Sequence, residues 1–192
     1  GELFFHLKKE RRFPELRVKF YSAQLLLALS HLHDQNVVFR DLKPENVLMD
    51  KDGNIMLTDF GLAKFLSRSD RTHTFCGTPE YLAPEVLLQK GHGKPVDWWS
   101  YGTLIFEMLV GIPPFYSEHV QEMYDKILNS DLILPEQLMS TEAMDLLTRL
   151  LERDPRRRLG SGPTGWLEIK NHPFFDGIDW DALYNKRIQA PF

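Results

Sequence analysis

The sequence predicts a single α+β domain in which helices predominate. Apolar residues recur at helical spacing from Pro14 to His33, and residues 96–111 are apolar on nearly every side of a helix. Three short apolar runs, at residues 37–39, 47–49 and 55–57, have the length and composition of strands. The 192 residues, 43% hydrophobic and 26% charged, have the size and composition of one ordinary globular domain.

The helices have identifiable ends and buried faces. Pro14 suits the first turn of the first helix, because an N–H at that position would lack a helical partner anyway. Asp97 lies near the start of the apolar helix, so we expect its carboxylate to be buried. Residues 145–153 are predicted to be the last part of a third helix, which ends before Asp154-Pro155. Four leucines should face inward there: Leu146, Leu147, Leu150 and Leu151.

The short apolar runs place the polar motifs of the chain on loops. Asp52-Gly53 separates the second and third runs and favours a tight hairpin between them. Residues 40–46 follow the first run, and residues 59–61 (Asp-Phe-Gly) follow the third. An Asp and an Asn five positions apart across a turn, joined by a second Asp from a later hairpin, can share one cleft. Such a set can orient a hydroxyl group and hold magnesium, as phosphoryl transfer requires.

Three motifs in this order resemble the protein kinase catalytic domain. They are residues 39–46 (Phe-Arg-Asp-Leu-Lys-Pro-Glu-Asn), residues 59–61 (Asp-Phe-Gly) and residues 83–85 (Ala-Pro-Glu). Lys43 and Thr78 match positions that mark serine/threonine kinases, where tyrosine kinases carry other residues. Phe39 departs from the usual His or Tyr. In the family this side chain packs under the Phe of Asp-Phe-Gly, which another aromatic ring can do.

Further runs resemble the AGC family of kinases. They are residues 72–81, 96–100 and 172–175, while residues 178–192 resemble the start of the carboxy-terminal tail in the Akt, serum-regulated and ribosomal-protein kinase branch. The resemblance implies that residues 1–177 are the large carboxy-terminal lobe of the catalytic domain. The small amino-terminal lobe, with its glycine loop and ATP-gripping Lys, is absent. We therefore expect the chain alone to be inactive.

The resemblance assigns the chemistry, with ATP and Mg²⁺ as cofactors, to a few side chains. Asp41 should orient the substrate hydroxyl or accept its proton. Lys43 should contact the transferred phosphate, and Thr78 should hydrogen-bond toward Asp41 and Lys43. Asn46 and Asp59 should hold magnesium through hard oxygen atoms. The residues expected at the nucleotide are Glu2, Glu45, Asn46, Leu48, Thr58 and Asp59.

Protein substrates with basic motifs are the implied partners. Acids that line the upstream groove in the AGC family match Glu2, Glu45 and Glu107, and they should select arginine over lysine. The expected motif is Arg-x-Arg-x-x-Ser/Thr followed by an apolar residue. The pocket for that last residue is matched by Phe75, Pro79 and Leu82.

Phosphorylation of the activation segment, which we define as residues 59–85, is expected to control activity. Thr74 is the matching acceptor for an upstream activating kinase. A phosphothreonine carries nearly two negative charges and three strong acceptor oxygens, so Arg40 and Lys64 should clamp it.

A buried ion pair between Glu85 and Arg158 is also implied by the resemblance. Because an unpaired buried charge costs about 3–5 kcal/mol, loss of either partner should destabilise the fold rather than alter the chemistry. The neighbouring Arg156 and Arg157 are predicted to lie on a solvated face rather than in a nucleic-acid or phospholipid patch.

The overall composition argues against several other functions. The net charge of −4 offers no basic field for nucleic acid or an anionic membrane surface. No apolar run approaches the roughly 20 residues of a membrane span, so we expect no direct membrane insertion. The single cysteine, Cys76, cannot form an internal disulfide. These features favour an intracellular location, cytoplasmic or also nuclear.

Two other patterns are interpreted as structural. His31 and His33 lie two apart on a helix and point to different sides, which disfavours a zinc site. Residues 160–165 match Gly-x-Gly-x-x-Gly, but no strand precedes them and Pro163 removes one amide that a phosphate would need. The sequence therefore predicts a loop between helices at this point.

Two alternatives to an active kinase stay open. A pseudokinase or interaction module would bind partners without chemistry because the small lobe is missing, but the intact Asp41, Lys43, Asn46 and Asp59 argue against it. A small-molecule phosphotransferase shares the spacing of Asp and Asn, yet the activation segment would have no purpose in such an enzyme.

Overall fold

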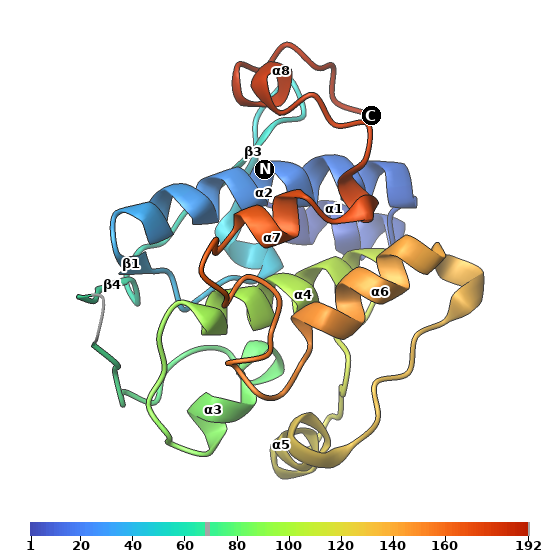
Figure 1. Ribbon diagram of the computed structural model, residues 1–192. Helices are drawn as coiled ribbons and strands as arrows, with labels where there is room; N and C mark the ends of the chain where they lie inside the picture. The colour runs from blue at the N-terminus through green and yellow to red at the C-terminus, as the bar shows by residue number, and fades with distance from the viewer. Residues whose placement is uncertain (68–69, 192) are drawn as a thin grey trace.

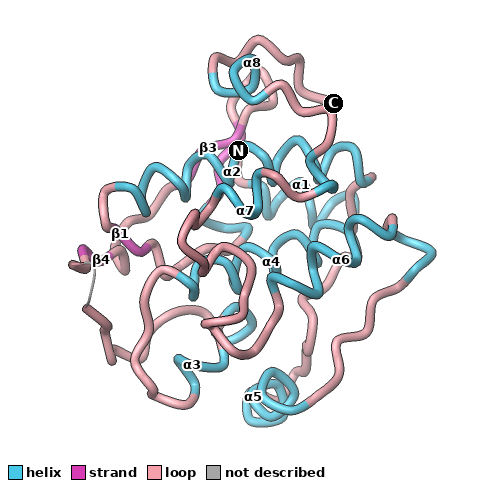
Figure 2. Tube along the Cα trace, in the orientation of Figure 1, coloured by secondary structure: helices cyan, strands magenta, loops and turns pink. Residues whose placement is uncertain are grey.

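The computed structural model describes residues 1–67 and 70–191, and it confirms the predicted α+β fold with mainly helical structure. Figures 1 and 2 show the long helices through the middle of the molecule and short strands between loops. The helices are α1 (Leu3–Glu10), α2 (Glu15–Asp34), α3 (Pro84–Leu87), α4 (Pro95–Val110), α5 (Val120–Asn129), α6 (Thr141–Leu150), α7 (Leu167–Lys170) and α8 (Trp180–Tyr184). The strands are β1 (Val37–Val38), β2 (Val47–Met49), β3 (Ile55–Leu57) and β4 (Lys64–Phe65). Short 3-10 helices are η1 (Pro44–Asn46), η2 (Pro79–Tyr81), η3 (Glu136–Leu138) and η4 (Pro173–Phe175).

The main hydrophobic core includes residues of α2, α4 and α6, and α4 packs against both α2 and α6 near the centre of Figure 1. α2 follows the prediction, since it begins directly after Pro14 and buries most of its apolar side chains. α4 is buried on nearly all sides, as its sequence predicts. Gly102 lets α6 approach α4 closely, because a Cβ atom there would lie 2.9 Å from the Cβ of Leu150.

α4 and α6 end in different ways. Gly111 ends α4 in the left-handed conformation, with φ of 102°, which favours glycine. α6 ends at Leu150, so the prediction that it continues to Arg153 is wrong. Arg153 instead donates from Nε to the carbonyl oxygen of Ile127 in α5, at 2.7 Å. Leu151 is buried as predicted, although it lies just beyond the helix.

The predicted hairpin is present. β2 and β3 pair antiparallel with Leu48 opposite Met56, and Gly53 takes a φ of 82° in the turn between them. β1 pairs with β4, which the sequence pattern did not predict because both residues of β4 are exposed. α1 and α5 were not predicted either. Each buries only two side chains, which are Leu3 and Leu7 in α1 and Met123 and Ile127 in α5.

The carboxy-terminal residues run back across α2. Lys19 donates to the carbonyl oxygen of Asp176, and α8 packs against α2 (Figure 1). Residues 160–165 form the predicted loop between α6 and α7. The carboxylate of Glu168 accepts a hydrogen bond from the N–H of Gly160 at 2.8 Å. This N–H is therefore already bonded to a side chain of the protein and is not free to bind a phosphate. None of the described helices has the length and apolarity needed to cross a membrane.

Candidate active site

Asp97, at the start of α4, fixes the loop that carries Asp41. The Asp97 carboxylate accepts the backbone N–H of Phe39 at 2.8 Å and that of Arg40 at 2.9 Å, and its Oδ2 lies 2.7 Å from Nε2 of His33. Arg40 has a φ of 68°, a conformation that non-glycine residues adopt rarely. The fully buried Asp97 therefore stabilises a strained backbone directly before the expected catalytic residue.

Three of the predicted catalytic and metal-binding side chains, on the loop and 3-10 helix after β1, lie together with a fourth from the activation segment. Asn46 donates from Nδ2 to Oδ2 of Asp41 at 2.9 Å and to the Asp41 carbonyl oxygen at 2.8 Å. Lys43 donates to the hydroxyl of Thr78 at 2.9 Å, and its Nζ lies 3.7 Å from Oδ1 of Asp41. The Thr78 hydroxyl reaches Oδ1 of Asp41 at 3.5 Å. One carboxylate, one ammonium, one amide and one hydroxyl thus form a single polar set.

Asp59 follows β3 and adopts a φ of 64°, again unusual for a residue with a side chain. Its Oδ1 accepts the N–H of Gly61 at 3.2 Å, and Oδ2 accepts no hydrogen bond from a described residue. Beside it, Phe60 packs edge-on against Phe39, with ring centroids 5.4 Å apart. Phe39 therefore fills the position that the resemblance gave to an aromatic side chain under Phe60.

The oxygen atoms of Asn46 and Asp59 fit a magnesium site. The amide nitrogen of Asn46 donates to Asp41, which leaves Oδ1 as the free ligand atom of this buried side chain. The described residues contain no cluster of three His, Cys, Asp or Glu side chains suited to a metal. A site with one amide oxygen and one carboxylate suits magnesium, which keeps water and takes phosphate oxygens as its other ligands.

The other residues expected at the nucleotide lie around the β2–β3 hairpin. Glu2 is exposed and forms an isolated backbone bridge with Leu48, which is half-buried in β2. Thr58 follows β3, and its N–H donates to the carbonyl oxygen of Asn46 at 2.9 Å. The backbone thus joins the two expected magnesium-binding segments, because Thr58 directly precedes Asp59.

Glu107 lies in a cluster of acids that the sequence identified only in part. It is half-buried on α4 and accepts a hydrogen bond from the hydroxyl of Tyr81. Burial, and then the negative charges of Glu45 and Glu80, raise the pKa of Glu107 to about 8. Glu80 was not predicted, although it lies in the Pro79-Glu80-Tyr81 run. Glu2, the third predicted acid, is exposed beside β2.

Three basic side chains, Arg40, Lys64 and His92, lie in or beside the activation segment. Lys64 donates to the hydroxyl of Thr72 at 3.0 Å, and Thr72 donates to the hydroxyl of the exposed Thr74 at 3.3 Å. Arg40 donates from Nε to the carbonyl oxygen of Leu62 at 2.7 Å, while its buried Nη1 has no hydrogen-bond partner among the described residues. Burial and the charge of Arg40 lower the pKa of His92 to about 4.

The three apolar residues predicted to form the pocket for the substrate residue after the acceptor differ in exposure. Phe75 is 51% exposed, Pro79 begins η2 and is half-buried, and Leu82 is only 4% exposed. Leu82 belongs to a second apolar cluster with residues of α3, α4 and α5, and it lies against Gly77. Phe75 therefore offers most of the apolar surface of this set.

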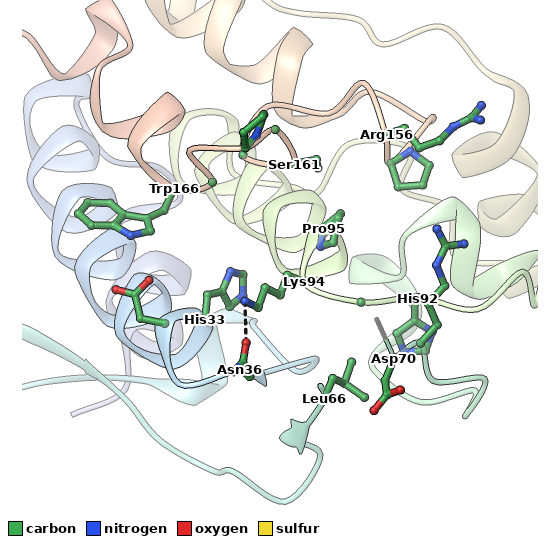
Figure 3. Close-up of a pocket in the computed structure, with 18 of the residues that line it drawn as sticks. His33, Asn36, Leu66, Asp70, His92, Lys94, Pro95, Arg156, Ser161 and Trp166 are labelled. Carbon is green, nitrogen blue, oxygen red and sulfur yellow. Dashed lines mark hydrogen bonds between the residues drawn. The ribbon is translucent and has the colours of Figure 1, made fainter. Parts of the chain in front are cut away.

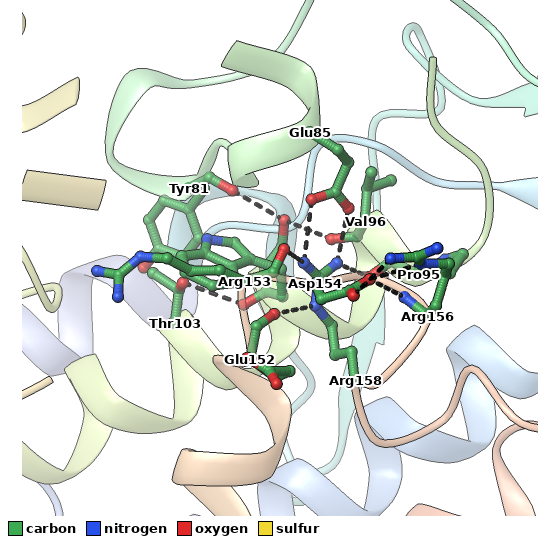
Figure 4. A network of polar contacts seen from close by, with 12 residues as sticks. Tyr81, Glu85, Pro95, Val96, Thr103, Glu152, Arg153, Asp154, Arg156 and Arg158 are labelled. Atoms are coloured by element: carbon green, nitrogen blue, oxygen red, sulfur yellow. Dashed lines mark hydrogen bonds and ion pairs between the residues drawn. The ribbon is translucent and has the colours of Figure 1, made fainter. Parts of the chain in front are cut away.

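Figure 4 shows the ion pair between Glu85 and Arg158. Two parallel hydrogen bonds of 2.7 and 3.0 Å join their side chains, and both residues are buried. Arg158 also donates to the carbonyl oxygens of Pro95 and Glu152, each at 2.9 Å. The neighbouring Arg156 and Arg157 have exposed side chains, so the predicted solvated face is confirmed for both.

A broad cavity of about 1160 Å³ lies apart from the predicted catalytic residues (Figure 3). Its walls come from the end of α2, the middle of the activation segment, the turn before α4 and the loop before α7. His92, Lys94 and Trp166 are among its lining residues, whereas Asp41 and Asp59 are not. The candidate active site is identified by the short distances among the polar side chains around Asp41, and not by the size of a cavity.

Comparison with known proteins identifies the family to which the chain is similar. Residues 1–175 match the protein kinase domain family. The chain is 57% identical to Protein kinase 2 of Dictyostelium discoideum over 192 residues, 58% identical to serine/threonine-protein kinase gad8 of Schizosaccharomyces pombe over 193 residues, and 53% identical to human serine/threonine-protein kinase Sgk2 over 193 residues. All of the chain is covered each time, but it spans only 40%, 33% and 52% of these relatives, respectively. The chain belongs to the protein kinase domain family.

Proposed function

We propose that the complete kinase containing this chain is an ATP- and magnesium-dependent protein serine/threonine kinase. In this proposal residues 1–177 form the large lobe of its catalytic domain, and residues 178–192 begin a carboxy-terminal tail. The observation that carries the proposal is the polar set in which Asp41, Lys43, Asn46 and Thr78 are joined by hydrogen bonds or close ionic contact.

Each member of this set has a distinct task. Asp41 accepts a hydrogen bond from the substrate hydroxyl and aligns that oxygen for attack. Lys43 places a positive charge where the transferred phosphoryl group passes, and Thr78 holds Lys43 in that position. Asn46 and Asp59 would hold magnesium, which when bound neutralises charge on the phosphates. Positioning and electrostatics account for most of the catalysis in phosphoryl transfer.

The acids beside this set select arginine upstream of the acceptor. Glu45, Glu80 and Glu107 lie close enough for the first two to raise the pKa of the third. A guanidinium group can satisfy two carboxylate oxygens at once, and each such contact is worth roughly 1.5–3 kcal/mol. Lys forms no matching fork and should substitute poorly. Phe75 and Pro79 favour an apolar side chain directly after the acceptor.

A peptide library phosphorylated by the complete kinase tests the function. We expect phosphate on Ser or Thr in peptides of the form Arg-x-Arg-x-x-Ser/Thr followed by an apolar residue. Preference for acidic or proline-directed peptides would contradict the proposed specificity. Nucleotide binding without transfer to any peptide would favour the pseudokinase, and transfer only to small molecules would favour a small-molecule phosphotransferase.

Recognition of arginine should depend on pH through Glu107. Its pKa of about 8 means that the free side chain is mostly protonated at neutral pH, whereas a guanidinium group prefers the carboxylate. We expect KM for an arginine-containing peptide to fall as pH rises toward the pKa, by up to about tenfold per unit. Steady-state kinetics between about pH 6.5 and about pH 9 measure this effect.

Two comparisons isolate the contribution of Glu107. At pH values above the pKa of Glu107, Glu107→Gln should raise KM for the arginine-containing peptide. The variant should also remove the pH dependence of KM, because glutamine does not titrate. A peptide with alanine in place of arginine should show no such dependence with the unmodified enzyme. An unchanged pH profile in Glu107→Gln would exclude Glu107 as its source.

Regulation by phosphorylation of Thr74 is part of the same proposal. The buried Nη1 of Arg40, which has no hydrogen-bond partner among the described residues, offers a donor to a phosphate on the activation segment. Lys64 already reaches this segment through Thr72. A phosphate on Thr74 would be drawn to both cations and would order the loop beside Asp41.

A further inference from the structure

The exposed side of α1 combines aromatic surface with positive charge. The helix buries only Leu3 and Leu7, which lie one turn apart on the same side. The other side presents two phenylalanines and two lysines at matching four-residue spacing, which are Phe4, Phe5, Lys8 and Lys9. Phe4 is 37% and Phe5 62% exposed, and both lysines are exposed. The ammonium group of Lys8 lies 6.0 Å from the centroid of the Phe4 ring, so charged and aromatic groups share one surface.

The turn after α1 adds two more cations to this surface. Arg11 and Arg12 are both exposed, so four of the five residues from 8 to 12 are basic and lie on the surface. Within the described part of the chain, no residue forms an ion pair or hydrogen bond with these four side chains. Glu10, the acid among them, is instead bound by Arg17 of α2 at 2.6 Å. We call Phe4, Phe5, Lys8, Lys9, Arg11 and Arg12 the α1 patch.

The charge of the α1 patch is opposite to that of the chain as a whole. The net charge of −4 predicted no basic field for an anionic surface. Electrostatic attraction in solution acts over about one Debye length, however, which is about 8 Å at physiological ionic strength. Glu2 lies at the other end of the helix, six positions before Lys8. A partner that touches the α1 patch therefore meets its four positive charges and not the net charge of the protein.

The position of the α1 patch favours a flat partner. Its residues line neither the cavity of Figure 3 nor a smaller cavity of about 550 Å³ beside the β2–β3 hairpin. A peptide or a single-stranded nucleic acid is commonly held along a groove. A bilayer instead meets a surface from outside, attracts Lys and Arg to its anionic headgroups, and accommodates aromatic rings at the headgroup level. The mixture of cations and exposed rings on α1 fits the bilayer.

We propose that the α1 patch is a docking surface for an anionic phospholipid bilayer. Its four cations contact the phosphate and carboxylate groups of the lipids, and its two aromatic rings enter the headgroup region without any segment crossing the bilayer. α1 packs against η1, which carries Asn46, and against β2. Docking through α1 therefore brings the candidate active site close to the bilayer and to substrates held there.

Sedimentation of the complete kinase with lipid vesicles tests this docking. One set of vesicles contains phosphatidylcholine alone, and the other contains phosphatidylcholine with phosphatidylserine. We expect the kinase to sediment with the anionic vesicles only. Raising the salt concentration from about 0.1 M to about 1 M shortens the Debye length from about 10 Å to about 3 Å and should release it. Failure to bind the anionic vesicles, or equal binding to both kinds, would contradict the proposal.

Variants of the complete kinase locate the binding surface. Each cation near an anionic surface contributes about fivefold to partitioning, so Lys8→Gln with Lys9→Gln should weaken binding about 25-fold. Phe5→Ala should weaken it about tenfold, because the ring no longer enters the headgroup region. The matched control, Lys90→Gln with Arg157→Gln, removes the same charge from two exposed residues outside the α1 patch and should bind like the unmodified kinase. Thermal unfolding should be the same for all of these variants, because each changed side chain is exposed.

The comparison between the two double variants decides the proposal. Equal partitioning of the α1 variant and the control variant would mean that the complete kinase binds bilayers elsewhere or through its general charge, and the proposal would be wrong. If a poly-glutamate peptide bound the kinase through Lys8 and Lys9 while anionic vesicles did not, the α1 patch would be assigned to an acidic protein segment instead. Sedimentation requires no phosphoryl transfer, so its outcome does not depend on the proposed function.

Discussion

Replacing Asp59 with Asn is expected to reduce the turnover of the complete kinase at least about 10³-fold, a change of about 4 kcal/mol in the activation barrier. The variant keeps the shape of the side chain but loses the charge that would hold magnesium. Asp59 is exposed, and its only hydrogen bond within the described residues is the 3.2 Å bond from the N–H of Gly61. Folding should therefore be unaffected. Phosphotransfer assays across a magnesium titration, together with thermal unfolding, measure both effects.

A matched control is Asp131→Asn, which removes the same charge from an exposed residue far along the sequence from the site. It should leave both turnover and unfolding unchanged. The assignment of Asp59 would be wrong if Asp59→Asn kept the activity of the unmodified enzyme. A fall in activity that accompanied a fall in melting temperature would instead assign Asp59 a structural role.

Residues whose chemistry depends on short sequence spacing were predictable from the sequence. Asp41 and Asn46 lie five positions apart, so one turn brings them together and the hydrogen bonds between them follow. The β2–β3 hairpin was predictable for the same local reason, since Asp52-Gly53 favours the turn. Asp59 was paired with Asn46 only through the resemblance of the motifs to the kinase family. The thirteen positions between these two residues in the sequence do not by themselves predict that their side chains lie close together.

Features set by tertiary contacts were not predictable. Glu80 joins Glu45 and Glu107 because η1, η2 and α4 meet in the fold, and no sequence period relates the three acids. Arg153 lies beyond the end of α6, and its guanidinium group donates to a carbonyl oxygen of α5, a contact between elements far apart in the sequence. Asp97 was predicted to be buried, but its three partners come from α2 and from the loop after β1. Their identity emerges only when those elements pack together.

Arg158→Ala is expected to lower the free energy of unfolding by about 3–5 kcal/mol, because it leaves Glu85 as an unpaired buried charge. For a domain of this size, that corresponds to a fall of roughly 6–20 °C in Tm. The carbonyl oxygens of Pro95 and Glu152 would lose a donor as well. Differential scanning calorimetry of the complete kinase measures the change, and turnover per folded molecule at low temperature should be nearly unaffected.

Arg157→Ala provides the matched control, because this neighbouring arginine has a 76% exposed side chain and contacts Glu152 at 3.3 Å. Exposed ion pairs contribute little, so its Tm should stay close to that of the unmodified enzyme. The double variant Glu85→Leu with Arg158→Met separates charge from packing. Since it removes both buried charges, it should be more stable than Arg158→Ala alone. Equal effects of Arg158→Ala and Arg157→Ala would mean that burial of the Glu85–Arg158 pair contributes nothing to stability, against the two short hydrogen bonds that join them.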